Sequence, residues 1–421
     1  MLYSSLSLFA RELTIEEAIS LGLKNSAEVK AAEADYNSQY NKQISSWLEL
    51  GPRLNAKYNH AFFDSKLVVP FNNQDVLLRD DVIKKGSLTL TQPITGLFAL
   101  AQKAIIDAKQ KNAKASLFKQ TKSQVAFRIA ESYLRAQQSE RMWEIEKARI
   151  ESSLAQKKDG EALYRAERIH KGDFLKLELS LSQAQSAEAK ARAQKEIAFY
   201  SLKELIGLNE PLSLSLVALI APQEAQKYPS LDEAIHRALN NRQDLKQAKL
   251  GKEMAKAGKF AAFAQIIPNI SFVAQIEHNF GKPSFSGGGT NKMLGLNLDW
   301  EFFNSGSSFF QLREAAFNAT KVLYQVDALK QAIRIEVMQI LASLTAAQEG
   351  LGFAFKAVEQ AKEAYRIEKL QFASGKSSAT ALVLAQTAKI LAEGNAVSLL
   401  SDLKIQKLKL QQALGEEQPV L

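Results

Sequence analysis

Strict alternation of apolar and polar residues marks four short segments of the chain and predicts β-strands. In Pro52–Phe63 nearly every second residue is apolar, and Pro268–Phe280 follows the same pattern. A further alternating segment follows each of these after a polar loop, so the two are expected to pair as a hairpin. The pattern predicts one hairpin from strands at about 52–63 and 86–95, and a second from strands at about 268–280 and 292–303.

Apolar residues at spacings of three and four fill most of the remaining chain and predict long helices. Leu97–Lys158 and Ser308–Gln371 contain no proline, and sixty residues of helix extend about 90 Å. Each is followed by a break marked by glycine, at Gly172 and Gly375, and then by a returning helical segment. Because lone helices of this length bury too little surface, we expect them to pack as antiparallel coiled-coil pairs.

The hairpins and helices belong to an internal repeat. Residues 15–33 match residues 231–249 at a constant offset of 216, which also brings Pro52 onto Pro268. Each copy opens with a helix, expected over about 14–48 and 230–265, whose N-cap and third residue form a capping box. The expected organisation is a segment resembling a signal-peptide remnant at 1–13, a first repeat at 14–207, a linker at 208–229, a second repeat at 230–415 and a tail at 416–421.

Alternation gives each strand one apolar and one polar face, which suits either a soluble sheet or a strand of an outer-membrane barrel. Aromatic residues near the strand ends are typical of a barrel, but a sandwich strand can look the same, so the strands alone leave both open. In a membrane, the apolar face would meet lipid and the polar face would line a water-filled lumen. The lipid-facing candidates are Leu54, Tyr58, Phe62, Phe272, Phe280, Leu296 and Trp300, and the lumen-facing candidates are Arg53, Asn55, Lys57, Asn269, Gln275, Glu277 and Asp299.

Four strands in one chain are too few for a membrane barrel, because even small closed barrels have about eight. Open sheet edges are not tolerated in lipid. The membrane interpretation therefore requires several chains that each contribute four strands to one barrel, with the long helices projecting into an aqueous compartment.

Composition narrows the class of protein. The 421 residues are 46% apolar and 24% charged, which fits a folded protein rather than a disordered one. The absence of cysteine excludes disulfides, thiolate metal sites and a cysteine nucleophile. No apolar run of 18 or more residues is present, so no transmembrane helix is expected. The net charge is +9. The basic residues alternate with acidic ones along the expected helices, which is the pattern of a solvated helix face.

The N-terminal segment and the short motifs carry little chemistry. Met1–Ala10 resembles the end of a secretory signal peptide, yet it lacks a basic region and its apolar core is too short. Either the true start lies upstream or the segment is something else. Gly375-Lys376-Ser377 lacks the earlier glycine of a phosphate-binding loop, because Leu370 stands there, and the four His have no ligand spacing. No catalytic, cofactor or metal site is expected.

At this level of organisation the chain resembles the TolC family of outer-membrane efflux proteins. The shared plan is a capped helix, a hairpin that starts at proline, a long helix, a glycine-marked turn and a return helix, present twice over about residues 12–415. Three segments carry the resemblance further: LTIEEAI at 13–19, Gln92-Pro93-Ile94 and WEFFNSG at 300–306.

The resemblance implies a mixed α/β membrane protein. Three chains would form a homotrimer with a 12-stranded β-barrel in the Gram-negative outer membrane, continued by a 12-helix α-barrel in the periplasm. It implies a passive exit duct of a tripartite efflux or type I secretion system, with no cofactor, no enzymatic activity and no nucleic-acid ligand. The implied partners are outer-membrane lipid, a periplasmic adaptor (membrane fusion) protein and an inner-membrane transporter of RND, ABC or MFS type. The exported substrate and the transporter class are not implied.

The resemblance also implies a periplasmic tip that opens by an iris-like movement of the inner helix pairs. The turns near Gly172 and Gly375 would meet the adaptor, with Phe372 beside the second turn. In the family an acidic residue follows the second glycine, whereas the segment around Ala381 has no acid. Glu178, six residues after Gly172, is the candidate counterpart, and we expect a gate that is weakly cation-selective or unselective.

A second interpretation is a soluble basic coiled-coil scaffold or nucleic-acid-binding protein, suggested by the pI of about 9.3. It leaves the four alternating segments unexplained. It therefore predicts a protein built from helices alone.

Overall fold

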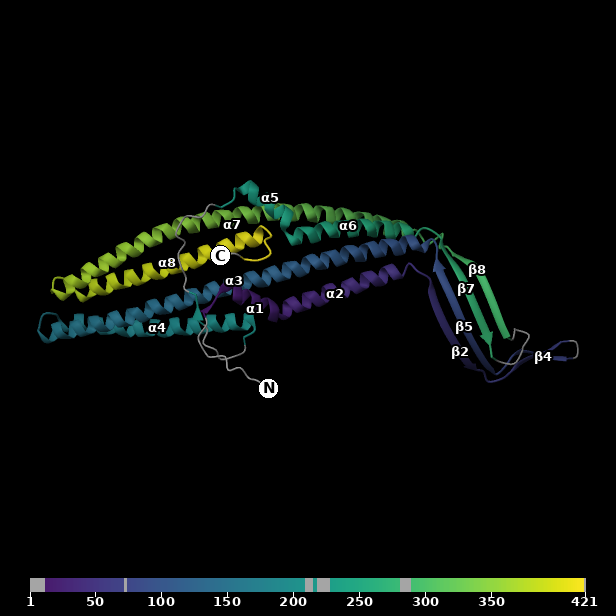
Figure 1. Cartoon of the computed structure of the whole chain (residues 1–421), viewed down its shortest axis with the longest axis horizontal. Helices are drawn as coiled ribbons and strands as arrows, with labels where there is room; N and C mark the ends of the chain where they lie inside the picture. The colour runs from purple at the N-terminus through teal and green to yellow at the C-terminus, as the bar shows by residue number, and fades with distance from the viewer. Residues whose placement is uncertain (1–11, 72–73, 209–214, 218–227, 281–288, 420–421) are drawn as a thin grey trace, which may run out of the picture. The chain divides into compact units, whose positions relative to one another are not determined.

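The computed structural model describes residues 12–71, 74–208, 215–217, 228–280 and 289–419. The expectation for residues 1–11, and most of the expected linker, lie outside these residues. Figure 1 shows the long helices and the strands. In chain order the elements are β1 (Glu12–Leu13), α1 (Ile15–Asn25), α2 (Ala27–Leu48), β2 (Arg53–Phe62), β3 (Leu67–Phe71), β4 (Gln74–Arg79), β5 (Val82–Pro93), α3 (Gly96–Arg165), α4 (Lys171–Ile206), β6 (Ser215–Leu216), α5 (Leu231–Asn241), α6 (Gln243–Ala264), β7 (Asn269–Asn279), β8 (Gly289–Asp299), α7 (Ser307–Ala373) and α8 (Ala379–Ala413).

The chain divides into two compact units, and both halves of the sequence contribute to each. Unit 1 consists of Met1–Ala32, Phe118–Gln243 and Leu329–Leu421, and unit 2 consists of Glu33–Leu117 and Asp244–Ala328. The helices α3 and α7 contribute residues to both units. Unit 2 holds the strands of the hairpins, and unit 1 holds the helix pairs and their turns.

The sheet of unit 2 is four-stranded and antiparallel, in the order β2-β5-β7-β8 (Figure 1). The ladder between β5 and β7 joins the hairpins of the two halves, with Leu88 opposite Ile276. Gly86 allows the ring of Phe280 to lie over the strand, because a Cβ at this glycine would stand 3.3 Å from Phe280 Cε2. The second interpretation, which predicts a protein built from helices alone, is therefore wrong.

The first hairpin contains a second, smaller one. The sequence predicted a polar loop between strands ending near 63 and starting near 86, and this is wrong. β5 already starts at Val82, and β3 and β4 pair as a separate antiparallel sheet within the expected loop. The segment LVVPF of β3 is apolar at consecutive positions, so it lacks the alternation by which the other strands were predicted.

Each expected opening helix is two helices. The capping box at Thr14 is present, since its side chain accepts from the Glu17 N–H and Glu17 accepts from the Thr14 N–H. Ser26 then leaves the helical conformation with ψ of 120°, and its hydroxyl accepts from the Val29 N–H to start α2. Arg242 makes the corresponding break between α5 and α6, with ψ of 128°. Neither break is marked by proline or glycine, so the helical pattern continues across it.

The core of unit 1 gathers around Tyr133 of α3. Tyr133 is buried among residues that include Ile129, Leu202 and Ile405. Its hydroxyl donates to the Leu13 carbonyl at 2.7 Å and accepts from the Val217 N–H at 3.2 Å. Burial raises the pKa of this phenol. The contact secures the parallel pair of β1 and β6 to α3.

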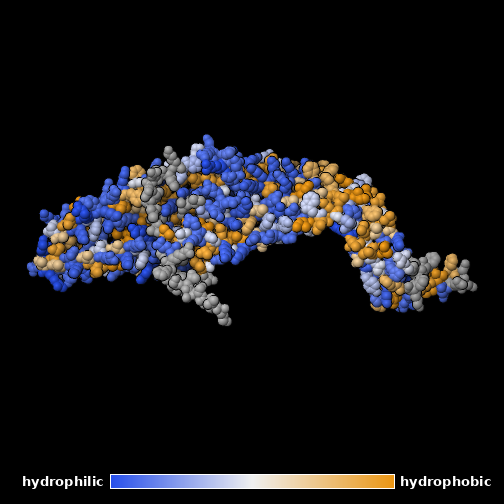
Figure 2. Space-filling view, in the orientation of Figure 1, coloured by the Kyte–Doolittle hydropathy of each residue, from blue (hydrophilic) through white to orange (hydrophobic). Residues whose placement is uncertain are grey.

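Large apolar side chains are exposed over much of unit 2. Figure 2 shows that hydrophobic residues gather where α6 and α7 approach the sheet, and that they continue onto the sheet. On the strands, Leu54, Leu294 and Leu296 are 65%, 74% and 71% exposed. Among the described residues, no helix combines the length and hydrophobicity needed to cross a membrane. One face of the sheet is thus apolar and uncovered within a single chain.

Candidate functional site

The strand register places the predicted polar residues on one face of the sheet. Residues directly opposite each other in a ladder point to the same face. Lys57 lies opposite Ser87, and Ser87 lies opposite Glu277. By the same register the row of Asn55 contains Gln275. All seven lumen-facing candidates belong to this face: Arg53, Asn55, Lys57, Asn269, Gln275, Glu277 and Asp299.

The other face is apolar over most of its rows. Leu54 lies opposite Leu90, and the row continues through Ala274 to Leu294. Phe272 and Leu296 form a further pair on this face. Of the lipid-facing candidates, Leu54, Tyr58, Phe62, Phe272 and Leu296 lie on it. Exposure to lipid stays a prediction, because the register fixes only which side chains share a face.

Two lipid-facing candidates lie just beyond the strands, where the alternation no longer applies. Phe280 follows β7, and its ring centroid is 6.3 Å from that of Tyr58. Trp300 follows β8, and its Nε1–H donates to the Ile266 carbonyl at 3.3 Å. The predicted strand at about 292–303 therefore ends too late, because β8 is Gly289–Asp299.

The polar face contains a charged residue that the sequence argument missed. Lys85 on β5 forms an ion pair with Glu277 on β7, with Nζ 3.4 Å from Oε1. Lys85 is two residues before Ser87 on β5, so the two side chains lie on the same face of the sheet. The signal was present in the alternation, but the predicted strand began at residue 86 and excluded it.

A cavity of about 760 Å³ lies in unit 2, where the polar face meets α3, α6 and α7. Its charged lining residues are Arg53, Asp299 and Glu301. Asn269 and Ser271 of β7 and Asn304 and Gln311 beyond the sheet add polar groups. The polar face therefore continues past the ends of the strands, onto the helices that follow.

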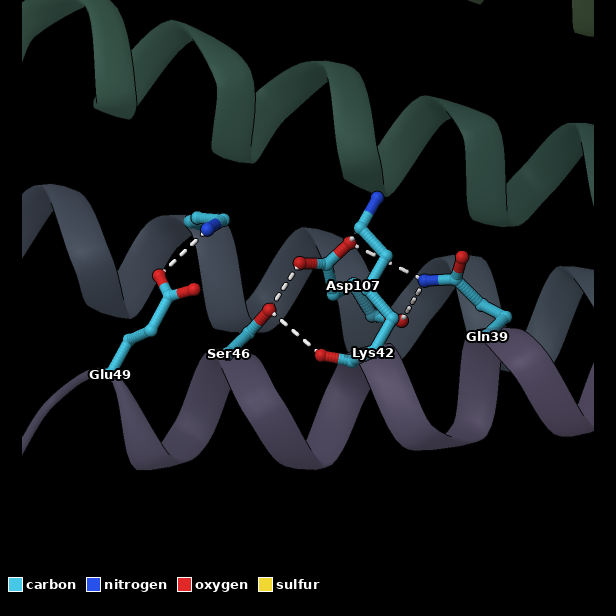
Figure 3. A network of polar contacts seen from close by, with 6 residues as sticks. Gln39, Lys42, Ser46, Glu49 and Asp107 are labelled. Carbon is cyan, nitrogen blue, oxygen red and sulfur yellow. Dashed lines mark hydrogen bonds and ion pairs between the residues drawn. The ribbon is translucent and has the colours of Figure 1, made fainter.

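A buried carboxylate joins α2 to α3 within unit 2. Asp107 is 5% exposed and accepts hydrogen bonds from Ser46 and from Gln39, the latter at 3.3 Å, and pairs with Lys42 at 3.4 Å (Figure 3). Burial favours the neutral acid, but these hydrogen bonds and the Lys42 charge outweigh it and lower the pKa of the Asp107 carboxyl. Gln39, Lys42 and Ser46 lie on one side of α2, so the network fixes the register of α2 on α3.

The turns of the two helix pairs meet at one end of unit 1. The Arg168 guanidinium donates to the Ser374 carbonyl at 3.1 Å, and Lys176 Nζ donates to Thr380 Oγ1 at 2.8 Å. Gly375 has φ of +75°, and a Cβ there would stand 3.1 Å from Arg168 Nη2. Glycine at 375 thus serves both the left-handed turn and the close approach of Arg168.

The other three tip candidates lie in different surroundings. The expected break at Gly172 is wrong, because this glycine lies in the first turn of α4 and the left-handed residue of the turn is Glu167. Glu178 pairs with Lys157 of α3 at 2.9 Å. Phe372 is 2% exposed and packs with Leu177, Ala379 and Leu382 in a small core. A gating role for any of them stays a prediction.

The charged residues of the polar face are arranged as in the lining of a water-filled pore. Among the described residues, no group of three or more His, Asp or Glu is placed to hold a metal ion. The charged residues of the sheet are spread along one face instead of converging on one point. Such a face can be wetted along its whole length, as the lining of a pore requires.

The chain was compared in sequence with protein families and with curated proteins. Residues 234–416 match the family model described as outer membrane efflux protein. No curated protein matches the chain in sequence. The resemblance seen in the sequence is thus confirmed, and the family match itself covers the second half of the chain.

Solved structures extend the likeness to the fold of nearly the whole chain. The CmeC outer membrane channel of Campylobacter jejuni is 14% identical with a TM-score of 0.83, and 95% of this chain and 85% of that chain are covered. VceC of Vibrio cholerae is 17% identical with a TM-score of 0.81, covering 95% and 96%. The MtrE outer membrane channel of Neisseria gonorrhoeae is 18% identical with a TM-score of 0.78, covering 95% and 88%.

Proposed function

We propose that this chain, whose second half matches the outer membrane efflux protein family and whose fold is that of outer-membrane channels, is a passive efflux channel of the Gram-negative outer membrane. The observation that carries the proposal is the two-faced sheet. Its apolar face suits lipid, and its polar face, which includes Arg53, Lys57, Glu277 and Asp299, suits a water-filled lumen. The channel itself performs no chemistry, so it is not an enzyme.

The open edges of the sheet favour a channel shared by several chains. Within the described residues, β2 and β8 each pair on one side only. An unpaired edge in lipid would leave backbone N–H and C=O groups without partners, each at a cost of several kcal/mol. Pairing of β8 in one chain with β2 in the next removes every edge, and a trimer does so with twelve strands.

The helices attached to the edge strands support the same assembly. α2, which precedes β2, exposes Tyr40 and Trp47, at 46% and 48%. α7, which follows β8, exposes Phe310, Phe317 and Tyr324 at 65%, 65% and 68%, spaced seven residues apart. A heptad stripe of this kind is suited to pack against a second helix. The α7 stripe of one chain and the α2 side chains of its neighbour would cover each other.

We propose that the channel is the outer-membrane component of a tripartite efflux or type I secretion system. In this role the tip of the helix pairs would meet a periplasmic adaptor, and an inner-membrane transporter of RND, ABC or MFS type would supply the energy. The exposed charged groups of the tip, including Arg168 and Lys176, are available for such a contact, as is the surface around Gly375. The exported substrate would be set by the transporter.

The lack of cysteine permits a direct test of the two faces. Lys57→Cys and Tyr58→Cys place a thiol on adjacent residues of β2 that lie on opposite faces. In planar bilayers we expect a bulky, charged maleimide to block ion conductance through the Lys57→Cys channel. The matched Tyr58→Cys channel should conduct unchanged, because its thiol faces lipid.

Two results would contradict the proposal. One is the absence of any conductance from the unmodified protein. The other is equal block of both variants, or block of Tyr58→Cys alone, which would mean that the polar face does not line the pore.

A further inference from the structure

We propose that the β3–β4 hairpins of neighbouring chains meet across the outer mouth of the channel and form an apolar constriction there. This inference rests on the proposed function, because it needs several chains around one pore. The occupant of the hairpin's exposed apolar surface is thus the same hairpin of a second copy of this chain.

The hairpin carries apolar side chains on both of its faces. Val68 lies opposite Leu77, and Val69 lies opposite Val76, so these two pairs point in opposite directions. On β3, Leu67, Val69 and Phe71 are 48%, 40% and 69% exposed. A two-stranded hairpin is marginally stable in water on its own. A surface of this kind therefore needs a cover that the chain itself does not supply among its described residues.

The bilayer is a poor candidate for that cover. A strand of about 9–11 tilted residues crosses a membrane, and β2 and β5 already have 10 and 12 residues. The small hairpin begins beyond the end of β2 and therefore lies past the membrane-spanning part of the strands. Figure 1 shows it leaving the end of the sheet at an angle to the long strands.

The base of the hairpin is closed by contacts between its two sides. Lys66 pairs with Asp80 at 3.0 Å, and the Arg79 guanidinium lies 4.0 Å from the centre of the Phe63 ring. The Phe63 N–H donates to the Asp81 carbonyl at 2.8 Å. These contacts order the base of the hairpin, so its apolar strands can meet a partner without the cost of ordering a free loop.

The dimensions allow the hairpins to meet. Twelve strands about 4.8 Å apart, tilted by about 40°, give a barrel with a radius of about 12 Å. A five-residue strand such as β3 extends about 16 Å. Three hairpins can therefore reach the axis, where an apolar ring would limit ion flow by excluding water.

Disulfide formation in outer membranes tests the contact directly. Under mild oxidation we expect Phe71→Cys, and Val69→Cys as a second position, to give covalent dimers of the chain. Lys57→Cys is the matched control, because equivalent residues on the wall of such a barrel lie about 20 Å apart, far beyond the Cα separation of about 4–7 Å that a disulfide allows. In planar bilayers, Val69→Asp should raise the conductance of the open channel.

The outcomes separate this inference from the proposed function. An assembly of three chains that conducts ions but gives no disulfide at position 69 or 71 would overturn the constriction and leave the channel intact. The inference would also be overturned if the Phe71→Cys thiol reacted with a lipid-soluble reagent and formed no disulfide with neighbouring chains, because lipid would then cover the hairpin. A protein with neither trimer nor conductance would instead contradict the proposed function.

Discussion

At the residue scale, two paired carboxylates of the described residues stabilise contacts between helices. Asp107 accepts from Gln39 and Ser46 and pairs with Lys42, so a buried carboxylate is fully satisfied between α2 and α3. Glu178 pairs with Lys157 between α3 and α4. Both carboxylates therefore contribute to how one helix is held against its neighbour, and each yields a prediction.

Replacement of Asp107 should lower stability in a pH-dependent way. Asp107→Ala removes the carboxylate that accepts from Gln39 and Ser46, although both donors keep a backbone carbonyl acceptor. Loss of a hydrogen bond to a charged group costs about 1.5–3 kcal/mol. Because the folded pKa of Asp107 is lowered, its contribution is present above the unfolded pKa of about 3.9. It is lost as the pH falls through the folded value.

The measurement is thermal unfolding of the detergent-purified protein as a function of pH. Asp107→Asn should melt below the unsubstituted protein at pH 7, and the difference should narrow below about pH 4. Asp159→Asn, at an exposed position of α3, is the control and should change little at either pH. A difference that stays constant down to pH 2 would contradict the role given to the ionised carboxylate.

Glu178→Gln should change the ion selectivity of the channel only slightly. The hydrogen bond and charge of Glu178 raise the pKa of the Lys157 ammonium, so the two charges already offset each other. Exposed charges are in addition screened over about 8 Å at physiological ionic strength. The permeability ratio of K⁺ to Cl⁻ in planar bilayers is the measurement, with Lys157→Gln as the matched variant. A strong loss of cation selectivity in Glu178→Gln alone would identify Glu178 as a gate residue instead.

At the element scale, the sequence predicted those elements whose pattern has one clear period. The alternation from Leu54 to Phe62 identified β2 and its faces, because a two-faced strand alternates strictly. β3 was missed because it is apolar on both faces, which leaves no alternation to detect. The helix breaks at Ser26 and Arg242 were missed because both residues are compatible with a helix and the apolar spacing continues across them. Contacts between segments distant in sequence, such as Asp107 with Ser46, depend on packing that no local pattern encodes.

The two faces of β8 should respond oppositely to the same substitution. Leu296 belongs to the apolar face and Asn297 to the polar face. Leu296→Arg places a charge against lipid, which costs about 2–4 kcal/mol near the bilayer midplane. Asn297→Arg places it in the lumen, where it remains hydrated. The amount of assembled protein in outer-membrane fractions measures the difference, and similar yields for the two variants would contradict the assignment of the faces.

At the scale of the whole molecule, a single chain presents surfaces that it cannot cover itself. The apolar sheet face, the unpaired sides of β2 and β8, and the aromatic side chains of α2 and α7 are all exposed in one chain. In the proposed channel, lipid would cover the first, and neighbouring copies would cover the other two. The lumen, the edge pairing and the outer constriction therefore all depend on a barrel shared between chains.

The most direct test is the native mass of the complex extracted from outer membranes in mild detergent, with bound detergent subtracted. We expect three chains of 46.6 kDa each, about 140 kDa in all. A monomer or dimer that needs no detergent would contradict this expectation, because its strands could not close a barrel.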